Sequence, residues 1–183
     1  MTVLPARTPR LIVRRFTTGD LDDFLAYQAD PEVRRHLPGE PMSPARAAGY
    51  LRAQAELDDR ARAAWHGYAV QHVADDRVIG DVGVWLPADP AATPDIGFQF
   101  HPARHGQGYA REAVRALLRH CFEGLGLPRV TATCDPANTA SQALMRRLGM
   151  RPAKDTPDTV QYDLSREQWL AGAAPPDQRA GSR

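Results

Sequence analysis

A glycine-rich segment opens the strongest helical pattern in the chain, and its residue types suit phosphate binding. It is His105-Gly106-Gln107-Gly108-Tyr109-Ala110, between a predicted strand and an amphipathic helix. Two glycines let the backbone turn tightly and approach a ligand closely. The first turn of the helix adds unpaired N–H groups and the positive end of the helix dipole. Glycine pairs before helices are common, so the segment alone does not exclude an ordinary turn. It is not a Walker loop, since no Lys-Ser/Thr follows, nor a dinucleotide fingerprint, since the third glycine is missing.

A second polar segment follows about one helix and one strand later. It runs from Asp135 to Ser141 after a predicted strand, and Asn138 can cap the helix that ends near Leu148-Gly149. The two segments therefore follow neighbouring strands and each opens a helix. This arrangement predicts that they meet at one end of a sheet.

The elements that position these segments are read from hydrophobic periodicity. A mix of strands with inserted helices predicts one α/β (α+β) domain over residues 1–170, and the small, polar residues 171–183 predict a disordered tail. The predicted strands are 11–16, 65–73, 78–86, 96–100, 129–134 and 160–164, and the predicted helices are 21–27, 44–62, 110–122 and 138–149.

Composition excludes several classes of protein. With 183 residues, 43% hydrophobic and 25% charged, the chain suits a globular domain. A net charge of +1 without a basic block predicts neither a nucleic-acid nor a membrane partner. The absence of a signal-peptide core near the start predicts a cytoplasmic protein. Two cysteines make no disulfide framework, Cys121 suits a buried helix face, and the six histidines lack partners at metal spacing, so no metal site is expected.

Taken in order, the two motifs resemble the GNAT superfamily of N-acetyltransferases, and most closely its RimJ/RimL-type branch. The opening Arg10-Leu11-Ile12-Val13-Arg14-Arg15-Phe16 and the pair Ile79-Gly80 are similar to that branch as well. The resemblance covers roughly residues 10–165. It implies the acyl-CoA N-acyltransferase fold, in which helices flank a mixed, mostly antiparallel central sheet with a splay between its middle strands.

The resemblance also implies roles for individual residues, with acetyl-CoA as co-substrate. The backbone of the glycine loop would hold the pyrophosphate, the strand before it would pair with the pantetheine arm, and the second motif would contact the arm and the sulfur. Asn138 would contact the pantetheine arm, and it could also cap its helix, since the two roles do not exclude each other. The implied cofactor-binding residues are Phe98, Gln99, Phe100, His105, Gly106, Gln107, Gly108, Tyr109, Ala110, Arg111, Asn138 and Ser141.

Two departures from the family pattern concern catalysis. The tyrosine that serves as general acid in some GNAT enzymes aligns with Met145, which cannot donate a proton, so the acid is Ser141, water or absent. The glutamate that the family often has before an Ile-Gly pair is replaced by Asp95, which precedes Ile96-Gly97. Aspartate is shorter than glutamate and would act through water. The alternative for Asp95 is a solvent-facing residue that begins a strand.

The resulting prediction is an acetyl-CoA-dependent N-acetyltransferase in which a bound amine attacks the thioester directly. The acceptor would be a small-molecule or peptide amine, such as a protein N-terminus, an aminoglycoside, a free amino acid or a polyamine, because the fold does not decide among them. A non-catalytic CoA-binding module is the alternative that Met145 leaves open. A homodimer is left open too.

Overall fold

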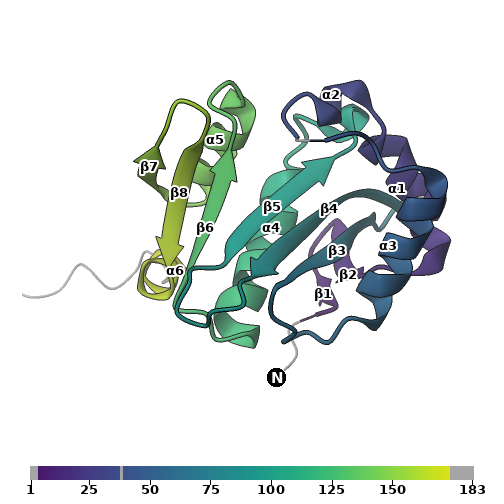
Figure 1. Cartoon of the computed structure of the whole chain (residues 1–183). Coiled ribbons are helices and arrows are strands. Elements are labelled where there is room, and N and C mark those ends of the chain that lie inside the picture. Colours follow the sequence, from purple (N-terminus) through teal and green to yellow (C-terminus); the bar gives the residue numbers. More distant parts are fainter. Residues whose placement is uncertain (1–3, 38, 174–183) are drawn as a thin grey trace, which may run out of the picture.

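The computed structural model describes residues 4–37 and 39–173. Within these residues, eight strands form one sheet in the order β1-β2-β3-β4-β5-β6-β8-β7 (Figure 1). Strand pairs are antiparallel except that β5 and β6 run parallel. The strands are β1 (Ala6–Arg7), β2 (Leu11–Arg15), β3 (Ala64–His72), β4 (Arg77–Leu86), β5 (Asp95–Phe100), β6 (Arg129–Cys134), β7 (Arg151–Asp155) and β8 (Val160–Ser165).

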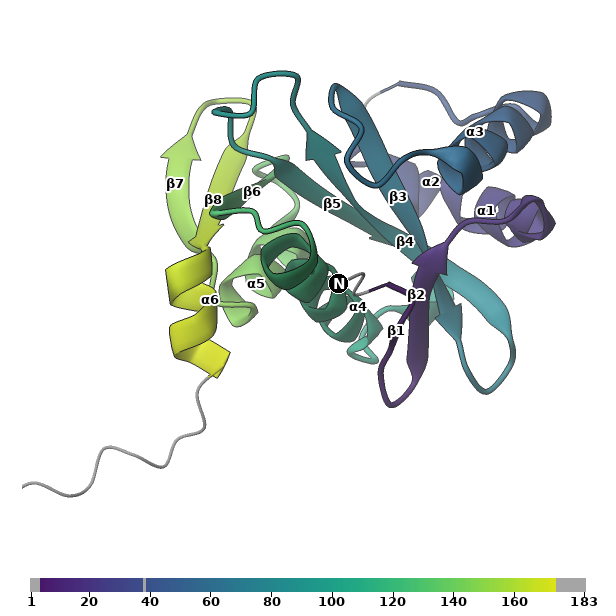
Figure 2. The same ribbon diagram turned by 90° about the horizontal axis from the view of Figure 1, so that it is seen from below.

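Helices cover both faces of the sheet. Seen from below, one group of three lies on one side of the sheet and the second group on the other (Figure 2). The first group is α1 (Leu21–Gln28), α2 (Pro31–Arg34) and α3 (Pro44–Glu56), and the second is α4 (Tyr109–Arg119), α5 (Thr139–Arg147) and α6 (Arg166–Ala173). The predicted mixed, mostly antiparallel sheet with flanking helices is confirmed.

The two helical layers bury separate apolar clusters. The larger one holds the inward face of α4, with Val114 and Leu117 fully buried, against Ile96 and Phe100 of β5. The smaller one joins α1 and α3 to the other face, around Phe24. Alternate residues of β5 therefore face different layers, because side chains alternate along a strand.

Several predicted boundaries were wrong. The helix predicted to reach 62 ends at Glu56, because Leu57 is extended (ψ 130) and Arg15 binds its carbonyl oxygen at 2.6 Å. The helix predicted over 110–122 is α-helical only to Arg119, and a π-helical turn, His120–Gly124, follows. Hydrophobic periodicity did not predict three elements, because their apolar residues do not recur at strand or helix spacing. They are the short strand β1, the fully exposed strand β7 and helix α6. Helix α6 extends to Ala173, and the rest of the predicted tail lies outside the described residues.

Candidate active site

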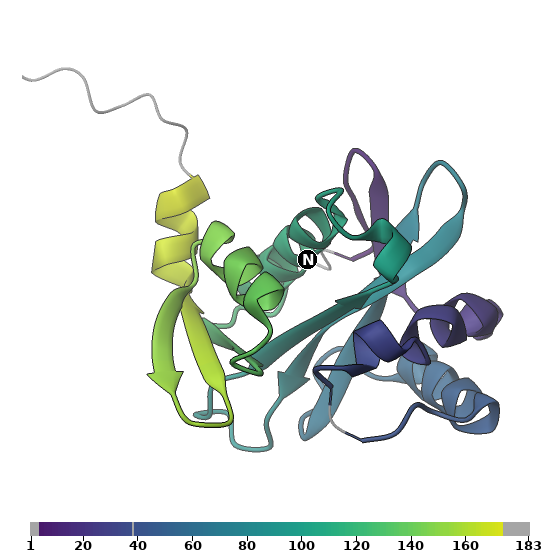
Figure 3. The same cartoon turned by 90° about the horizontal axis from the view of Figure 1, so that it is seen from above.

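Strands β5 and β6 part after two residue pairs. Asp95 pairs with Thr131 and Ile96 with Ala132, whereas β5 pairs with β4 over six positions. Beyond these pairs the two strands diverge towards the end at which both point (Figure 1), and Figure 3 looks onto that open end. We call this opening the splay. Its two edges leave backbone groups without a strand partner.

The pairing of β5 decides which residues present those groups to the splay. His101 N–H donates to the Ile79 carbonyl oxygen of β4, at 2.9 Å. Backbone groups alternate in direction along a strand, so Gln99 also faces β4, whereas Phe98 and Phe100 face the splay. The His105 ring nitrogen Nε2 donates to the Phe100 carbonyl oxygen at 2.9 Å. This leaves both polar groups of Phe98 and the N–H of Phe100 facing the splay.

The glycine loop lies directly after β5 and opens α4. Gly106 (φ +73) and Gly108 (φ +82) both have left-handed backbone conformations, which residues with a Cβ atom disfavour. No side chain caps α4, and its first helical bond is Glu112 N–H to the Gly108 carbonyl oxygen at 3.2 Å. The N–H groups of Tyr109, Ala110 and Arg111 therefore have no partner within the helix, as an anion site requires.

A network from the turn between β1 and β2 holds this loop in place. The Arg10 guanidinium donates to the Gln107 carbonyl oxygen at 2.9 Å and lies 4.4 Å from the centroid of the Tyr109 ring. It also forms a 2.7 Å ion pair with Glu112. Burial would raise the pKa of Glu112, but hydrogen bonds from Thr8 and Arg10 outweigh it and lower that pKa. The network keeps the loop carbonyl turned towards Arg10 and away from the first turn of α4.

The second predicted motif borders the other edge of the splay, after β6. Asn138 caps α5, its Oδ1 accepting from the Ser141 N–H at 3.0 Å, so the predicted capping role is confirmed. The Ser141 side chain is buried beside Cys134, the last residue of β6. Burial raises the pKa of the Cys134 thiol, and a hydrogen bond with Ser141 opposes the rise. Met145 is 1% exposed and belongs to the main core.

Comparison with known proteins identifies the family. A family model described as "Acetyltransferase (GNAT) domain" matches residues 10–151. The chain belongs to the GNAT acetyltransferase family. This membership implies acetyl-CoA as co-substrate and an amine as acceptor.

Individual GNAT relatives agree with the family match. An uncharacterized N-acetyltransferase, YnaD of Bacillus subtilis, is 30% identical over 144 residues, covering 79% of this chain and 81% of that protein. The FsC-acetyl coenzyme A-N(2)-transacetylase of Aspergillus fumigatus is 36% identical over 88 residues, covering 42% of this chain and 37% of that protein. A GNAT-family acetyltransferase structure from Bacillus anthracis has a TM-score of 0.75 at 24% identity, covering 88% of this chain and 98% of that one.

Asp95 sits at the closed end of the splay in this GNAT site. It is the first residue of β5, and it accepts hydrogen bonds from the hydroxyls of Thr131 (2.8 Å) and Thr133 (3.1 Å) on β6. Burial raises its pKa, and the two threonine hydrogen bonds oppose the rise. A carboxylate with a raised pKa is better suited to accept a proton than an ordinary surface aspartate.

A second carboxylate near the splay was missed by the sequence analysis. Asp81 of β4 is 4% exposed, and its Oδ2 accepts from Tyr27 of α1 and from Gln99 of β5, both at 2.8 Å. Burial raises its pKa to about 6, although both hydrogen bonds oppose the rise. The Gln99 Oε1 atom is buried without a hydrogen-bond partner. No local signal could have found this cluster, because its three residues come from distant segments.

Helix α2 and the residues after it also contact both sides of the open end. His36 Nδ1 lies 3.3 Å from Asp135 Oδ2, just after β6. Glu32 Oε1 lies 3.9 Å from Nδ1 of His105, at the start of the glycine loop. These contacts place the α2 segment across the mouth of the splay.

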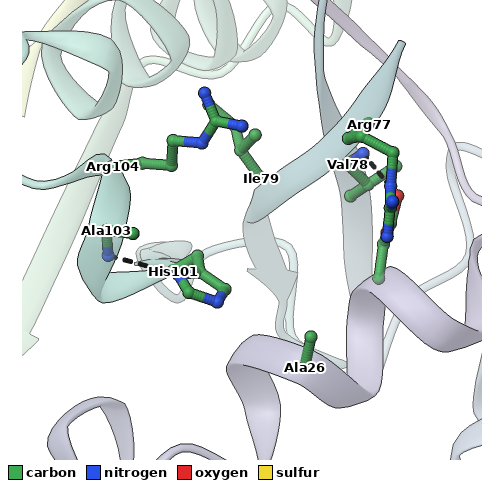
Figure 4. Close-up of a pocket in the computed structure, with 8 residues that line it drawn as sticks. Ala26, Arg77, Val78, Ile79, His101, Ala103 and Arg104 are labelled. Atoms are coloured by element: carbon green, nitrogen blue, oxygen red, sulfur yellow. Dashed lines mark hydrogen bonds and ion pairs between the residues drawn. The ribbon is translucent and has the colours of Figure 1, made fainter. Parts of the chain in front are cut away.

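A separate hollow of about 240 Å³ lies between α1, the start of β4 and the 3-10 turn Pro102–Arg104. Arg77 and Arg104 stand on either side of it, with His101 below Arg104 in the view of Figure 4. Arg104 is paired with Asp75 at 2.6 Å, and Arg77 is paired with Asp23. Because carboxylates already neutralise both arginines, we assign this hollow no anion.

Two further findings concern metals and membranes. Among residues 4–37 and 39–173, no group of three or more His, Cys, Asp or Glu side chains is arranged to hold a metal ion. In the same described segments, no helix is long and apolar enough to cross a membrane.

Proposed function

We propose that the chain binds acetyl-CoA with its pantetheine arm in the splay and passes the acetyl group directly to a primary amine. The observation that carries this proposal is the parting of β5 and β6 after Ile96 and Ala132, directly beside an uncapped helix N-terminus. An extended arm with amide groups can add to an open strand edge as another strand would. The pyrophosphate would bind the loop from Gly106 to Arg111.

The reaction then needs one bond formed and one broken. The amine nitrogen attacks the thioester carbon, the carbonyl oxygen becomes an oxyanion, and the carbon–sulfur bond breaks as the intermediate collapses. The N–H groups of Phe98 and Phe100 are the donors available on β5 to stabilise the oxyanion. Asp95 would take the proton that the amine loses, through water. Ser141 would give a proton to the departing thiolate.

The acceptor class is narrower than the family alone implies. A peptide α-amine, with a pKa of roughly 8, needs less help from a base than an alkylamine with a pKa near 10. Asp95 acting through water would suffice for the former.

The Arg10–Phe16 segment and Ile79-Gly80 support assignment to the RimJ/RimL-type branch.

The test measures thiol release from acetyl-CoA with a panel of amines, alongside calorimetry of acetyl-CoA binding. We expect binding, and thiol release that depends on the added amine. Binding without release for any amine would favour the alternative, a non-catalytic CoA-binding module. Absence of binding would contradict the proposal as a whole.

A further inference from the structure

Three glycines lie side by side across β3, β4 and β5. Gly67 pairs with Gly83, and Gly83 pairs with Gly97. A Cβ on Gly67 would lie 2.6 Å from the Tyr50 hydroxyl of α3, so this row is on the face that α1 and α3 cover. Glycine inside a strand weakens a sheet and often marks a place where another group approaches the backbone closely.

The approaching group is the indole of Trp65. A Cβ on Gly83 would lie 2.5 Å from its Cζ2, and a Cβ on Gly97 would lie 2.9 Å from its Cη2. The ring therefore covers bare backbone and extends from β3 to β5. A smaller ring would leave the row uncovered, and any side chain on Gly83 would push the indole away.

The indole is held rigidly. A hydrogen bond from Trp65 lowers the pKa of Tyr50, against the larger effect of burial, which raises it. The Gln54 side chain of α3 donates to the Trp65 carbonyl oxygen at 2.9 Å and accepts from the Gly67 N–H at 2.6 Å. The ring and the backbone that carries it are thus both anchored to α3.

The far edge of the indole lies at the closed end of the splay. Gly97 is the residue after Ile96, whose pair with Ala132 is the last between β5 and β6. On the same face, Trp65 pairs across strands with Trp85, and Trp85 pairs with Asp95. Trp85 is 40% exposed. Two indoles and one carboxylate therefore border the place where the arm would end.

We propose that Trp65 selects the acceptor, which is a primary amine carried on an apolar, planar group. The planar group packs on the indole, and its amine lies towards Asp95 and the thioester. One carboxylate beside two indoles suits a single amine on an apolar body better than a polycation, which would need several carboxylates. This inference rests on the proposed function, since it names the acceptor of that same site.

The experiment compares phenylalaninamide with alaninamide, two α-amines that differ only in the phenyl group. We expect the wild type to prefer phenylalaninamide in kcat/KM by about tenfold or more, as aromatic packing on an indole would give. Trp65→Ala should lose that preference through the KM for the amine, with the KM for acetyl-CoA unchanged, and Trp65→Phe should keep part of it. Trp169→Phe, against Phe122 on the opposite face, is the matched control.

A second measurement does not depend on the Ala variant folding. With CoA present, phenylalaninamide should shift the Trp65 indole N–H resonance of the wild type and leave that of Trp169 in place. Equal activity with both amines, or a Trp65→Ala enzyme with unchanged preference, would overturn the inference while acetylation itself stands. If acetyl-CoA does not bind, the proposed function fails first, and this inference fails with it.

Discussion

The two faces of the sheet at the splay differ in the kind of group that they offer a ligand. On the α4 face, most of the groups available to a ligand belong to the backbone, namely the first N–H groups of α4 and the edge of β5, and Ser141 of α5 is the one side chain assigned a role there. Arg10 and Glu112 there hold the loop, since Arg10 binds the Gln107 carbonyl oxygen and pairs with Glu112. On the α1–α3 face, the groups beside the splay are side chains, above all Trp65 and Asp95.

This difference explains what can be inferred from the family and what cannot. A backbone site tolerates many sequences provided that glycines and caps keep its shape, so relatives of low sequence identity can share it. A side-chain site changes with each substitution, so the acceptor must be inferred from this chain's own residues. Apart from the Ser141 side chain, loss of function should therefore follow backbone changes on the α4 face and side-chain changes on the α1–α3 face.

The largest effect should come from the loop backbone. Gly108→Val places a branched side chain at a left-handed position, where even a Cβ alone would lie 3.4 Å from a guanidinium nitrogen of Arg10. We expect calorimetry to find no acetyl-CoA binding in the folded variant. Gly126→Val is the control, because Gly126 is also left-handed (φ +70) with nothing within 4 Å of a Cβ, and it lies outside the loop. Unchanged affinity in Gly108→Val would remove the loop from the cofactor site.

Ser141→Ala tests the side chain at the other edge of the splay. If Ser141 protonates the thiolate, turnover should fall on the order of a hundredfold, and the KM for acetyl-CoA should change far less. Thr139→Ala, an exposed hydroxyl in the first turn of the same helix, is the matched control. A loss of twofold or less would assign the proton to water.

Asp95→Asn should have a smaller effect that depends on pH. A base must be ionised, so burial, which raises the pKa of Asp95, moves the acidic limb of the rate profile to higher pH. We expect the variant to lose that limb and to turn over more slowly on the plateau, by less than the roughly hundredfold that a base in direct contact contributes, because Asp95 acts through water. Thr133→Ala removes one stabilising hydrogen bond and should move the limb higher still. Identical profiles in all three proteins would leave deprotonation to bulk water.

The smallest effect on turnover is expected at Asp81, where stability should change instead. Its pKa is raised from 3.8 to about 6 in the folded state, so ionisation disfavours folding, and this penalty grows as pH rises from about 4 to 6. At about 1.4 kcal/mol per pH unit, the penalty at neutral pH is roughly 3 kcal/mol. Asp81→Asn should therefore melt at a higher temperature than wild type at pH 7. At pH 4 the two proteins should melt at similar temperatures. A lower melting temperature at pH 7 would contradict this assignment.

Local patterns predicted the backbone elements that the proposed cofactor site would use. The glycines of the loop, the Asn138 cap and the strand before the loop each leave a short sequence signal, and the described structure brings them to one end of the sheet. The endings of elements were less accurate. Helix α3 stops at Glu56 because Arg15, far away in sequence, binds the carbonyl oxygen of Leu57.

Among the side chains discussed for the site, Asp95 and Ser141 were expected from the resemblance to the family, but the others could not be predicted from local patterns, for the same reason. Asp81 and Tyr27 are 54 positions apart, and Arg10 and Glu112 are 102 apart. The glycine row becomes visible only when the register of three strands is known. These contacts depend on tertiary packing, and periodicity within one segment carries no information about them.

The most direct test of the splay as the cofactor site is amide hydrogen exchange of the wild type with and without saturating CoA. If the arm adds as a strand between β5 and β6, the N–H groups of Phe98 and Phe100 should exchange more slowly with CoA bound. The Gln99 N–H, which already faces β4, should change little. Protection of Gln99 alone, or of none of the three, would contradict the account.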